Sequence, residues 1–263
     1  MPTFKITIAY DGGPFVGWQR QSKGTSVQGL IEDALRDLDG RDVTVHGAGR
    51  TDAGVHALGQ VASFTLVRDD VDADVIRRAL NNKLPGEIRV CAADAVPASF
   101  HARFHATSKR YRYRIWHGDV LPPFERNYAW HVFGALDMPA MIEAACFVEG
   151  RHDFAAFQAV GGTAGPTERT MTLSRISSPE PGTSSADGHV IEYEIEGDGF
   201  LRHMVRAVVG TLMEIGRGRK PPAWMREVIA SRDRAEAGRS APAQGLFLVR
   251  VDYGVVQFDP HVA

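Results

Sequence analysis

A single carboxylate stands in a glycine-rich loop in the first half of the chain. The segment Gly47–Ala57 reads Gly-Ala-Gly-Arg-Thr-Asp-Ala-Gly-Val-His-Ala, and Asp52 is the only acidic residue between Asp42 and Asp69. Glycines permit positive φ and close backbone approach, so a ligand can lie against such a loop. The spacing matches neither Gly-x-Gly-x-x-Gly nor Gly-Lys-Ser/Thr. Asp52 is therefore a candidate nucleophile, general base or metal ligand; the alternative is a turn aspartate that bonds its own backbone.

Aromatic and cationic side chains occur together in two further segments. One early loop contains Trp18, Gln19 and Arg20. In Lys109–Arg114 the period of two of a strand places tyrosines on one face and arginines on the other, namely Tyr111 and Tyr113 against Arg110, Arg112 and Arg114. Stacking rings beside phosphate-binding cations suit single-stranded or loop RNA. A core strand with inward tyrosines and a solvated basic face explains the same pattern equally well.

A third candidate segment, Phe200–Arg206, opens an apolar helix. The start of a helix favours anions, and Arg206 falls within the first turn or two. The alternative is a surface arginine whose stem lies along a buried face.

Composition limits the classes of protein that the chain can represent. Its 263 residues are 44% hydrophobic and 24% charged, which excludes collagen-like, coiled-coil and disordered chains and suggests two domains. Two cysteines, Cys91 and Cys146, cannot form a disulfide framework or a four-ligand zinc site. The apolar stretches are shorter than the roughly 20 residues of a membrane span, and the N-terminus lacks the pattern of a signal peptide. We therefore expect a cytoplasmic protein with no membrane partner.

The net charge of −2 argues weakly against a nucleic-acid partner, but the charges are segregated. Between Phe100 and Trp116 there are five Lys or Arg residues and no acid. Between Leu201 and Arg226 six basic residues accompany Glu214 alone. Two local basic segments thus remain compatible with RNA binding.

The elements that position these residues repeat one order twice. In the first half, the alternation in Phe4–Tyr10 predicts a strand, and Thr25-x-x-Gln28 predicts a capping box for an amphipathic helix that Gly40 ends. The remaining elements of this half are expected as strands at 43–45, 60–64 and 88–96 and a helix at 72–80. In the second half, strands are expected at 110–116, 171–176, 189–196 and 245–253, and helices at 138–148, 200–215 and 221–231. A loop rich in Pro, Gly and Ser spans Ser177–Gly188.

Two βαββαβ units in tandem predict an α+β fold of two ferredoxin-like domains. We expect a mixed, mostly antiparallel sheet with a central cleft, where a site between domains usually lies. The predicted domains are residues 1–105, with the glycine-rich loop, and residues 106–263, with the boundary near Phe104–Ser108.

The motifs resemble those of the tRNA pseudouridine synthase A family. Arg50-Thr-Asp-Ala-Gly-Val-His56 with Gln60 resembles its catalytic signature, and five further segments resemble its other motifs in the same order from about Phe4 to Tyr253: Gly17–Arg20, Phe100–Arg103, Lys109–Tyr113, His203–Arg206 and Gly245–Leu248. The resemblance implies an enzyme without cofactor or metal that isomerises uridine to pseudouridine at positions 38, 39 and 40, in the anticodon stem-loop of tRNAs. It also implies a homodimer with a basic cleft on each protomer. Family members commonly carry a longer polar C-terminal extension than the ten residues that follow Tyr253 here.

The resemblance also implies roles for single residues. Asp52 matches the nucleophile, and attack on ribose C1′, attack on the uracil ring and elimination to a glycal all stay open. Arg206 matches the cation that keeps the aspartate ionised, with Arg50 as the alternative nearby in sequence. Tyr111 matches the tyrosine that stacks on the target base and is a candidate for removing the C5 proton, although the ordinary pKa of a phenol favours stacking. Leu246 matches an apolar position of the uracil pocket, with a strand-core role as its alternative.

A stem-loop uridine must leave its stack before it can react, which costs a few kcal/mol. Compensating contacts are expected from Trp18, Gln19, Arg20, Arg110, Arg112 and Arg114, although Trp18 is also suited to be a core anchor. His56, next to Val55, is expected to be packed or bonded to backbone. The alternatives to the enzyme are a non-catalytic RNA-binding protein with a basic aromatic strand and a ferredoxin-like lyase or hydrolase that uses Asp52 as a base.

Overall fold

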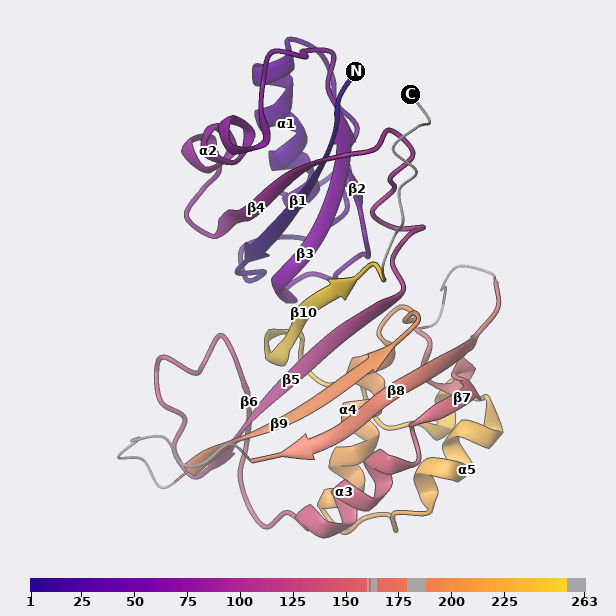
Figure 1. Ribbon diagram of the computed structural model, residues 1–263. Coiled ribbons are helices and arrows are strands. Elements are labelled where there is room, and N and C mark those ends of the chain that lie inside the picture. The colour runs from indigo at the N-terminus through magenta and orange to yellow at the C-terminus, as the bar shows by residue number, and fades with distance from the viewer. Residues whose placement is uncertain (160, 162–164, 179–187, 255–263) are drawn as a thin grey trace. The chain divides into compact units, whose positions relative to one another are not determined.

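The computed structural model describes residues 1–159, 161, 165–178 and 188–254, and these residues form two compact units (Figure 1). Among the described residues, the first unit comprises Met1–Ser108 and Leu248–Gly254, and the second lies within Lys109–Phe247. Leu248–Gly254 thus groups with the first unit, whereas the predicted segment 106–263 groups it with the second half.

The first unit is a four-stranded antiparallel βαββαβ motif with one added strand. Its strand order is β4-β1-β3, and β2 and β10 also lie along β3. Figure 1 shows α1 and α2 together on one side of this sheet. The elements in chain order are β1 (Thr3–Tyr10), α1 (Val27–Asp39), β2 (His46–Gly47), β3 (His56–Thr65), α2 (Ala73–Lys83) and β4 (Ile88–Val96).

Helix α1 shows how local sequence sets an element. It buries Val27, Ile31 and Leu35 on one face and ends at Gly40, whose φ of 76° is left-handed, as expected. The cap itself differs from the prediction, because Ser26 and not Thr25 accepts from the Gly29 amide, at 3.2 Å. The Gln28 side chain is buried and donates to the Val45 carbonyl, so it is not free to complete a capping box.

The second unit is built on the strand order β5-β9-β8-β7, with the short β6 parallel to β5. Three helices, α3, α4 and α5, cover one face of this sheet (Figure 1). The elements are β5 (Ser108–Gly118), β6 (Trp130–Val132), α3 (Met138–Cys146), β7 (Gly150–Asp153), β8 (Glu168–Ser177), β9 (Gly188–Gly197), α4 (Met204–Gly216) and α5 (Trp224–Ser231). The boundary between the units falls within β10 (Leu246–Asp252), after Phe247. Three single-turn 3-10 helices lie at Ala155–Phe157, Arg234–Glu236 and Ala243–Gly245.

The α+β fold class is confirmed, and several elements differ from the prediction. No strand forms at 43–45, where β2 instead occupies His46–Gly47, and α5 begins at Trp224 instead of 221. The short strands β6 and β7 were not expected. Helix α4 begins at Met204 instead of Phe200, because His203 is left-handed, with φ 63°. Most of the predicted loop at Ser177–Gly188 lies outside the described residues.

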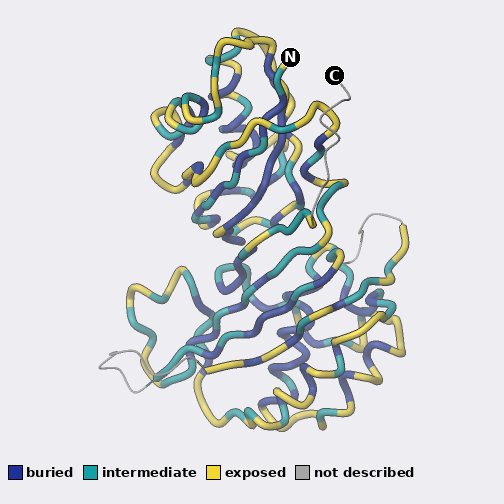
Figure 2. Tube along the Cα trace, viewed as in Figure 1, coloured by how far each residue is buried: buried dark blue, intermediate teal, exposed yellow. Residues whose placement is uncertain are grey.

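Each unit has its own buried core, drawn in dark blue in Figure 2. In the first unit, Phe4, Ile6 and Ile8 on β1 are almost wholly buried. In the second unit, nearly all of α4 is buried and its Gly210 touches a neighbouring main chain: a Cβ there would lie 1.7 Å from the Arg239 carbonyl oxygen. This close contact fixes α4 against the segment that runs toward β10.

Candidate active site

The loop that carries Asp52 is held by main-chain contacts to an earlier loop. Asp52 forms an isolated antiparallel bridge with Gly17, and the Trp18 amide donates to the Thr51 carbonyl at 3.0 Å. Gly17 has a φ of 108°, and a Cβ there would lie 2.6 Å from the Thr51 carbonyl oxygen. Only glycine fits this position without strain.

Side chains beneath the loop complete its support. The Tyr10 hydroxyl lies 2.8 Å from Thr51 Oγ1, and Gln60 Nε2 donates to the Gly49 carbonyl at 2.8 Å. Burial raises the pKa of Tyr10 to about 12, against opposing hydrogen bonds to Thr51 and Gln60, so its hydroxyl keeps its proton at neutral pH. Tyr10 and Thr51 could not be recognised as supporting residues from sequence, because they meet only when distant segments pack.

Asp52 itself is half-buried and begins a tight turn. The Val55 amide donates to the Asp52 carbonyl at 3.1 Å, and Gly54 takes a φ of 77°. Main-chain groups therefore close this turn. The neighbouring Arg50, the alternative cation in the prediction, is exposed.

His56 is a packed histidine, as predicted. Its side chain is 2% exposed, and its Nδ1 accepts a hydrogen bond of 3.0 Å from the Gly12 amide. The Asp11 carboxylate lies 3.1 Å from the same nitrogen. A main-chain N–H and a carboxylate thus both lie within hydrogen-bond distance of Nδ1 and hold the ring in place.

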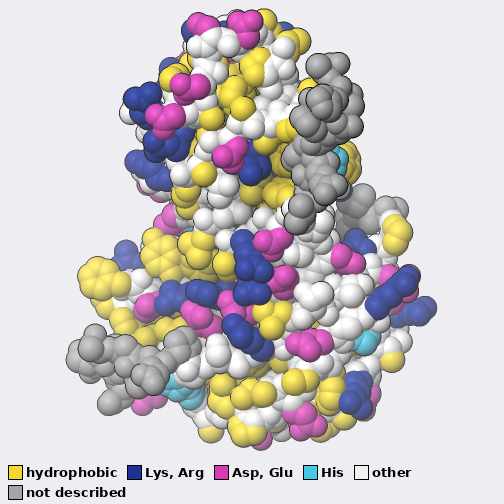
Figure 3. Space-filling model, viewed as in Figure 1, with side chains coloured by type: hydrophobic (Ala, Val, Ile, Leu, Met, Phe, Trp, Pro, Cys, Tyr) yellow, Lys and Arg dark blue, Asp and Glu magenta, His cyan; other side chains and the backbone are white. Residues whose placement is uncertain are grey.

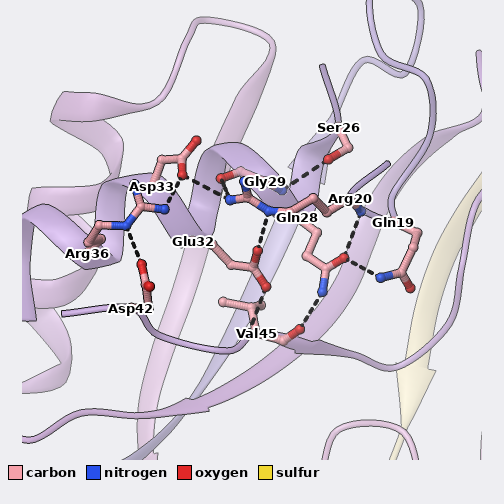
Figure 4. Close-up of polar contacts among 10 residues, drawn as sticks. All are labelled: Gln19, Arg20, Ser26, Gln28, Gly29, Glu32, Asp33, Arg36, Asp42 and Val45. Carbon is pink, nitrogen blue, oxygen red and sulfur yellow. Dashed lines mark hydrogen bonds and ion pairs between the residues drawn. The ribbon is translucent and has the colours of Figure 1, made fainter. Parts of the chain in front are cut away.

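The segment Trp18–Arg20, predicted to contact the substrate, is engaged within the first unit (Figure 4). Trp18 is 2% exposed and lies under Gly47, so it takes its alternative role as core anchor. Gln19 and the Arg20 amide both donate to the buried Gln28 side chain, at 2.8 and 2.9 Å.

The Arg20 guanidinium is held by helix α1. It pairs with Glu32 at 2.7 Å and Asp33 at 2.9 Å, and also donates to the Gly29 carbonyl. The hydrogen bond from Arg20 is the main cause that lowers the pKa of Asp33. An RNA phosphate therefore has to compete with two carboxylates for this guanidinium.

In the second unit, β5 alternates as predicted. Tyr111 and Tyr113 are buried, whereas Arg110, Arg112 and Arg114 are half-buried on the other face. Tyr111 meets the Phe200 ring edge-on, with centroids 4.8 Å apart.

The arginine face of β5 is neither bare nor fully solvated, because it pairs with the neighbouring strand β9; its predicted contact with phosphate stays a prediction. Their antiparallel register sets each arginine directly opposite a glutamate: Arg110 faces Glu196, Arg112 faces Glu194 and Arg114 faces Glu192. We call these six residues the ion-pair ladder. Its closest contacts are 2.6 Å from Arg110 to Glu196 and 3.1 Å from Arg112 to Glu194, and Figure 3 shows basic and acidic side chains interleaved over this sheet. The alternating glutamates of 189–196 were the signal that sequence reasoning missed.

Arg206 lies in the first turn of α4 and is fixed by its neighbours. Its Nε donates to the Ala241 carbonyl at 2.7 Å, and its own carbonyl accepts from the Ala241 amide at 2.9 Å. Arg206 also lies close enough to Tyr113 to oppose the effect of burial, which raises the pKa of that phenol. The Tyr113 hydroxyl donates to the Pro242 carbonyl at 2.8 Å.

Leu246 begins β10 directly after this group and is buried. A Cβ at the preceding Gly245 would lie 2.7 Å from the Tyr113 ring, so the chain passes close to that tyrosine. The second unit thus assembles Tyr113, Arg206 and the segment 241–245 as one packed group. Asp52 belongs to the first unit, and its pairing with Arg206 stays a prediction.

In the part of the chain that the structure describes, no helix is both long and apolar enough to span a bilayer. Within the same residues, no three His, Cys, Asp or Glu side chains are placed to hold a metal ion.

A family model described as tRNA pseudouridine synthase matches residues 6–105 and 144–254, which include the Asp52 loop, and this match places the chain in the class of RNA-isomerising enzymes. Proteins named tRNA pseudouridine synthase A are similar over nearly the whole chain. The one from Moorella thermoacetica is 44% identical and that from Syntrophotalea carbinolica 42%, each over 96% of this chain and over 100% and 97% of their own lengths. The chain belongs to the tRNA pseudouridine synthase family, and it is an isomerase. The resemblance inferred from its motifs is confirmed.

Among solved structures, an H/ACA ribonucleoprotein bound to a substrate RNA containing 2′-deoxyuridine is 10% identical, with a TM-score of 0.34. The match covers 80% of this chain and 44% of that chain.

Proposed function

We propose that this enzyme converts uridine to pseudouridine at positions 38, 39 and 40 of the tRNA anticodon stem-loop, with Asp52 as its nucleophile. Family membership supports the reaction, and the resemblance of the Arg50–His56 motif supports the nucleophile. The observation that carries the proposal is the anchoring of Asp52 through its main chain to Gly17. A carboxylate fixed in this way keeps its position while its side chain reacts.

The reaction requires no other reactant. The bond between N1 and C1′ breaks and one between C5 and C1′ forms; C5 loses a proton and N1 gains one. Because atoms and electrons balance within the nucleotide, the chain's own residues suffice. We propose that cofactor and metal are not needed.

The nucleophile must be ionised in every version of the mechanism. A cation beside a carboxylate favours its charged form. We propose Arg206 as that cation, because its Nε is already held by Ala241 and its guanidinium is therefore oriented before substrate binds. Tyr111 then stacks on the uracil and Leu246 lines its apolar side.

Following the family resemblance, we also propose that the enzyme is a cytoplasmic homodimer. Sedimentation of the purified protein tests the dimer, and a species of monomer mass at all concentrations would contradict it.

Mapping the product on an unmodified tRNA transcript tests the substrate proposal. The transcript carries uridine at positions 38, 39 and 40, and carbodiimide treatment with primer extension locates pseudouridine. We expect product at these three positions only, and none in a matched transcript with cytidine there. Product elsewhere would overturn the position, and bound but unreacted tRNA would favour the non-catalytic RNA-binding protein.

A further inference from the structure

A stack of three aromatic rings lies on the surface of the first unit, away from the Asp52 loop. His46 and His101 are 4.8 Å apart between ring centroids, and His101 and Phe104 are 4.3 Å apart. The ring planes in these two pairs are inclined to each other by 31° and 32°. Phe104, at the end of the stack, is 73% exposed. An exposed aromatic ring that continues a stack offers a face on which a nucleic-acid base can stack.

The stack is rigid, although it lies in a turn. The Ala102 amide donates to Ser63 Oγ on β3 at 3.0 Å, and the Ala102 carbonyl accepts from the Tyr253 hydroxyl at 2.7 Å. Ala102 and Phe100 belong to a buried cluster with Val61. Phe104 is therefore displayed by an anchored segment, and a ligand does not have to order it.

Two histidines of this segment accept main-chain hydrogen bonds through Nδ1. His101 Nδ1 accepts from the Arg103 amide at 3.1 Å, and His105 Nδ1 accepts from the His101 amide at 3.2 Å. In a neutral ring with this geometry the proton is on Nε2, an N–H that can donate to an acceptor such as a phosphate. Burial, with His46 and His105 nearby, lowers the pKa of His101, so its ring is neutral at pH 7.

The charge around the stack suits a polyanion. The exposed Arg103 holds its guanidinium 5.8 Å from the centre of the Phe104 ring. The sequence contains no acidic residue between Asp94 and Asp119. An arginine beside a stacking ring is the combination that binds base and phosphate together.

A small hollow beside His46 is too small to enclose a typical free ligand, but it can accept a group that belongs to a larger polymer. It measures about 190 Å³ and carries the hydroxyl groups of Thr3, Thr44, Ser63 and Thr65. This volume is below the roughly 300 Å³ at which small-molecule pockets begin.

We propose that His46, His101, Arg103 and Phe104 form a second RNA-binding site, which stacks an unpaired tRNA base on Phe104 and binds its phosphate through Arg103. The inference rests on the proposed function, because that function supplies tRNA as the ligand. The site is separate from the reacting nucleotide. His46 is paired with Ser63 on β3. Tyr10, which contacts Thr51 beneath the Asp52 loop, is paired with Ala57 near the other end of β3. Ser63 and Ala57 are six residues apart, on the order of 20 Å along the strand.

Equilibrium binding of an unmodified tRNA transcript tests the proposal with four proteins. They are the wild type, Phe104→Ala, Phe104→Tyr and, as a matched control, Phe124→Ala, which removes a phenylalanine that is 88% exposed in the second unit. We expect Phe104→Ala to weaken binding about tenfold, within the range for one stacked base. Phe104→Tyr and Phe124→Ala should each stay within about twofold of the wild type, because one keeps a ring and the other lies elsewhere.

A second variant and a second readout keep the test decisive. Arg103→Gln should reduce the slope of log affinity against log salt by about 0.7 to 0.9 if it removes one phosphate contact. The single-turnover rate at saturating tRNA should stay unchanged in Phe104→Ala. Wild-type affinity in Phe104→Ala, an equal loss in Phe124→Ala or an unchanged slope in Arg103→Gln would overturn the second site. A wild type that binds tRNA but makes no pseudouridine would instead overturn the proposed function and leave the binding comparison valid.

Discussion

Asp52 depends on neighbours that hold its main chain. Gly17 pairs with it, Trp18 binds Thr51, and Val55 closes the turn that follows. A substitution at position 52 that keeps the size of the side chain therefore leaves the loop in place. The contribution of the carboxylate can thus be separated from that of the fold.

At the residue scale, Arg206→Ala should reduce turnover far more than tRNA affinity. If Arg206 keeps Asp52 ionised, its loss should slow single-turnover pseudouridine formation about 100-fold or more, with tRNA affinity changed by only a few fold. Rapid-quench kinetics and equilibrium binding measure the two quantities separately. Arg226→Ala is the matched control, because that arginine stacks on Phe147, 3.8 Å from its ring. Comparable losses of rate and affinity in Arg206→Ala would make Arg206 a phosphate contact.

At the scale of elements, the pairing of β5 with β9 places the arginines of β5 in ion pairs with the glutamates of β9. Glu194 is nearly buried and accepts hydrogen bonds from both Arg112 and Arg175. Burial is the largest influence and raises its pKa, but the bonds from the two arginines together lower the pKa below its ordinary value. The ion-pair ladder therefore stabilises the second unit when Glu194 is ionised.

This pairing predicts a pH-dependent loss of stability in Glu194→Gln. Because folding lowers the pKa of Glu194, its contribution is complete above the unfolded value near 4.3 and is lost as the pH falls through the folded value. We expect the variant to lose about 1 to 2 kcal/mol at pH 7, reduced by the exposure of Arg175, and less near pH 3. Urea unfolding at both pH values measures the difference. Glu168→Gln is the control, since its partner Arg151 is mostly exposed; a loss for Glu194→Gln that is equal at both pH values would contradict the assignment.

The elements that could be predicted from sequence are those long enough to show a clear hydrophobic period. β1, α1 and β5 show clear alternation or an apolar helical face, and the structure contains all three. β6 and β7 are too short, at three and four residues, to show a period. The late start of α4 follows from the left-handed backbone of His203, which a run of apolar residues does not reveal.

The same distinction applies to the site. Asp52 and Tyr111 could be predicted as candidates through motif and alternation, because their neighbours in sequence carry the signal, and their roles stay predictions. Tyr10 beneath Thr51 and Glu32 beside Arg20 were missed, because these contacts arise only when separate elements pack.

At the scale of the whole molecule, charge is nearly balanced, with 30 basic and 32 acidic residues. Several of the arginines predicted to contact RNA are paired with carboxylates, in the ion-pair ladder and between Arg20 and α1. Cations outside these pairs, such as the exposed Arg50, are therefore better placed to bind phosphate.

This charge distribution predicts different effects for two arginines on the salt dependence of tRNA binding. Arg50→Gln should reduce the slope of log affinity against log salt by about 0.7 to 0.9, the value for one phosphate contact. Arg112→Gln should leave the slope unchanged and lower the free energy of unfolding, because Arg112 already pairs with Glu194. Binding titrations from low to physiological salt give both slopes. The reverse assignment would show that the ladder opens to bind RNA.

The most direct test of the account is tritium release from a tRNA transcript labelled at uridine C5, with wild-type enzyme and with Asp52→Asn. Asparagine keeps the size of the side chain and the main-chain contacts, but it cannot act as a carboxylate nucleophile. We expect the wild type to release label from positions 38, 39 and 40, and Asp52→Asn to bind the same tRNA and release none. Release by Asp52→Asn at a rate close to that of the wild type would contradict the role of Asp52 as nucleophile.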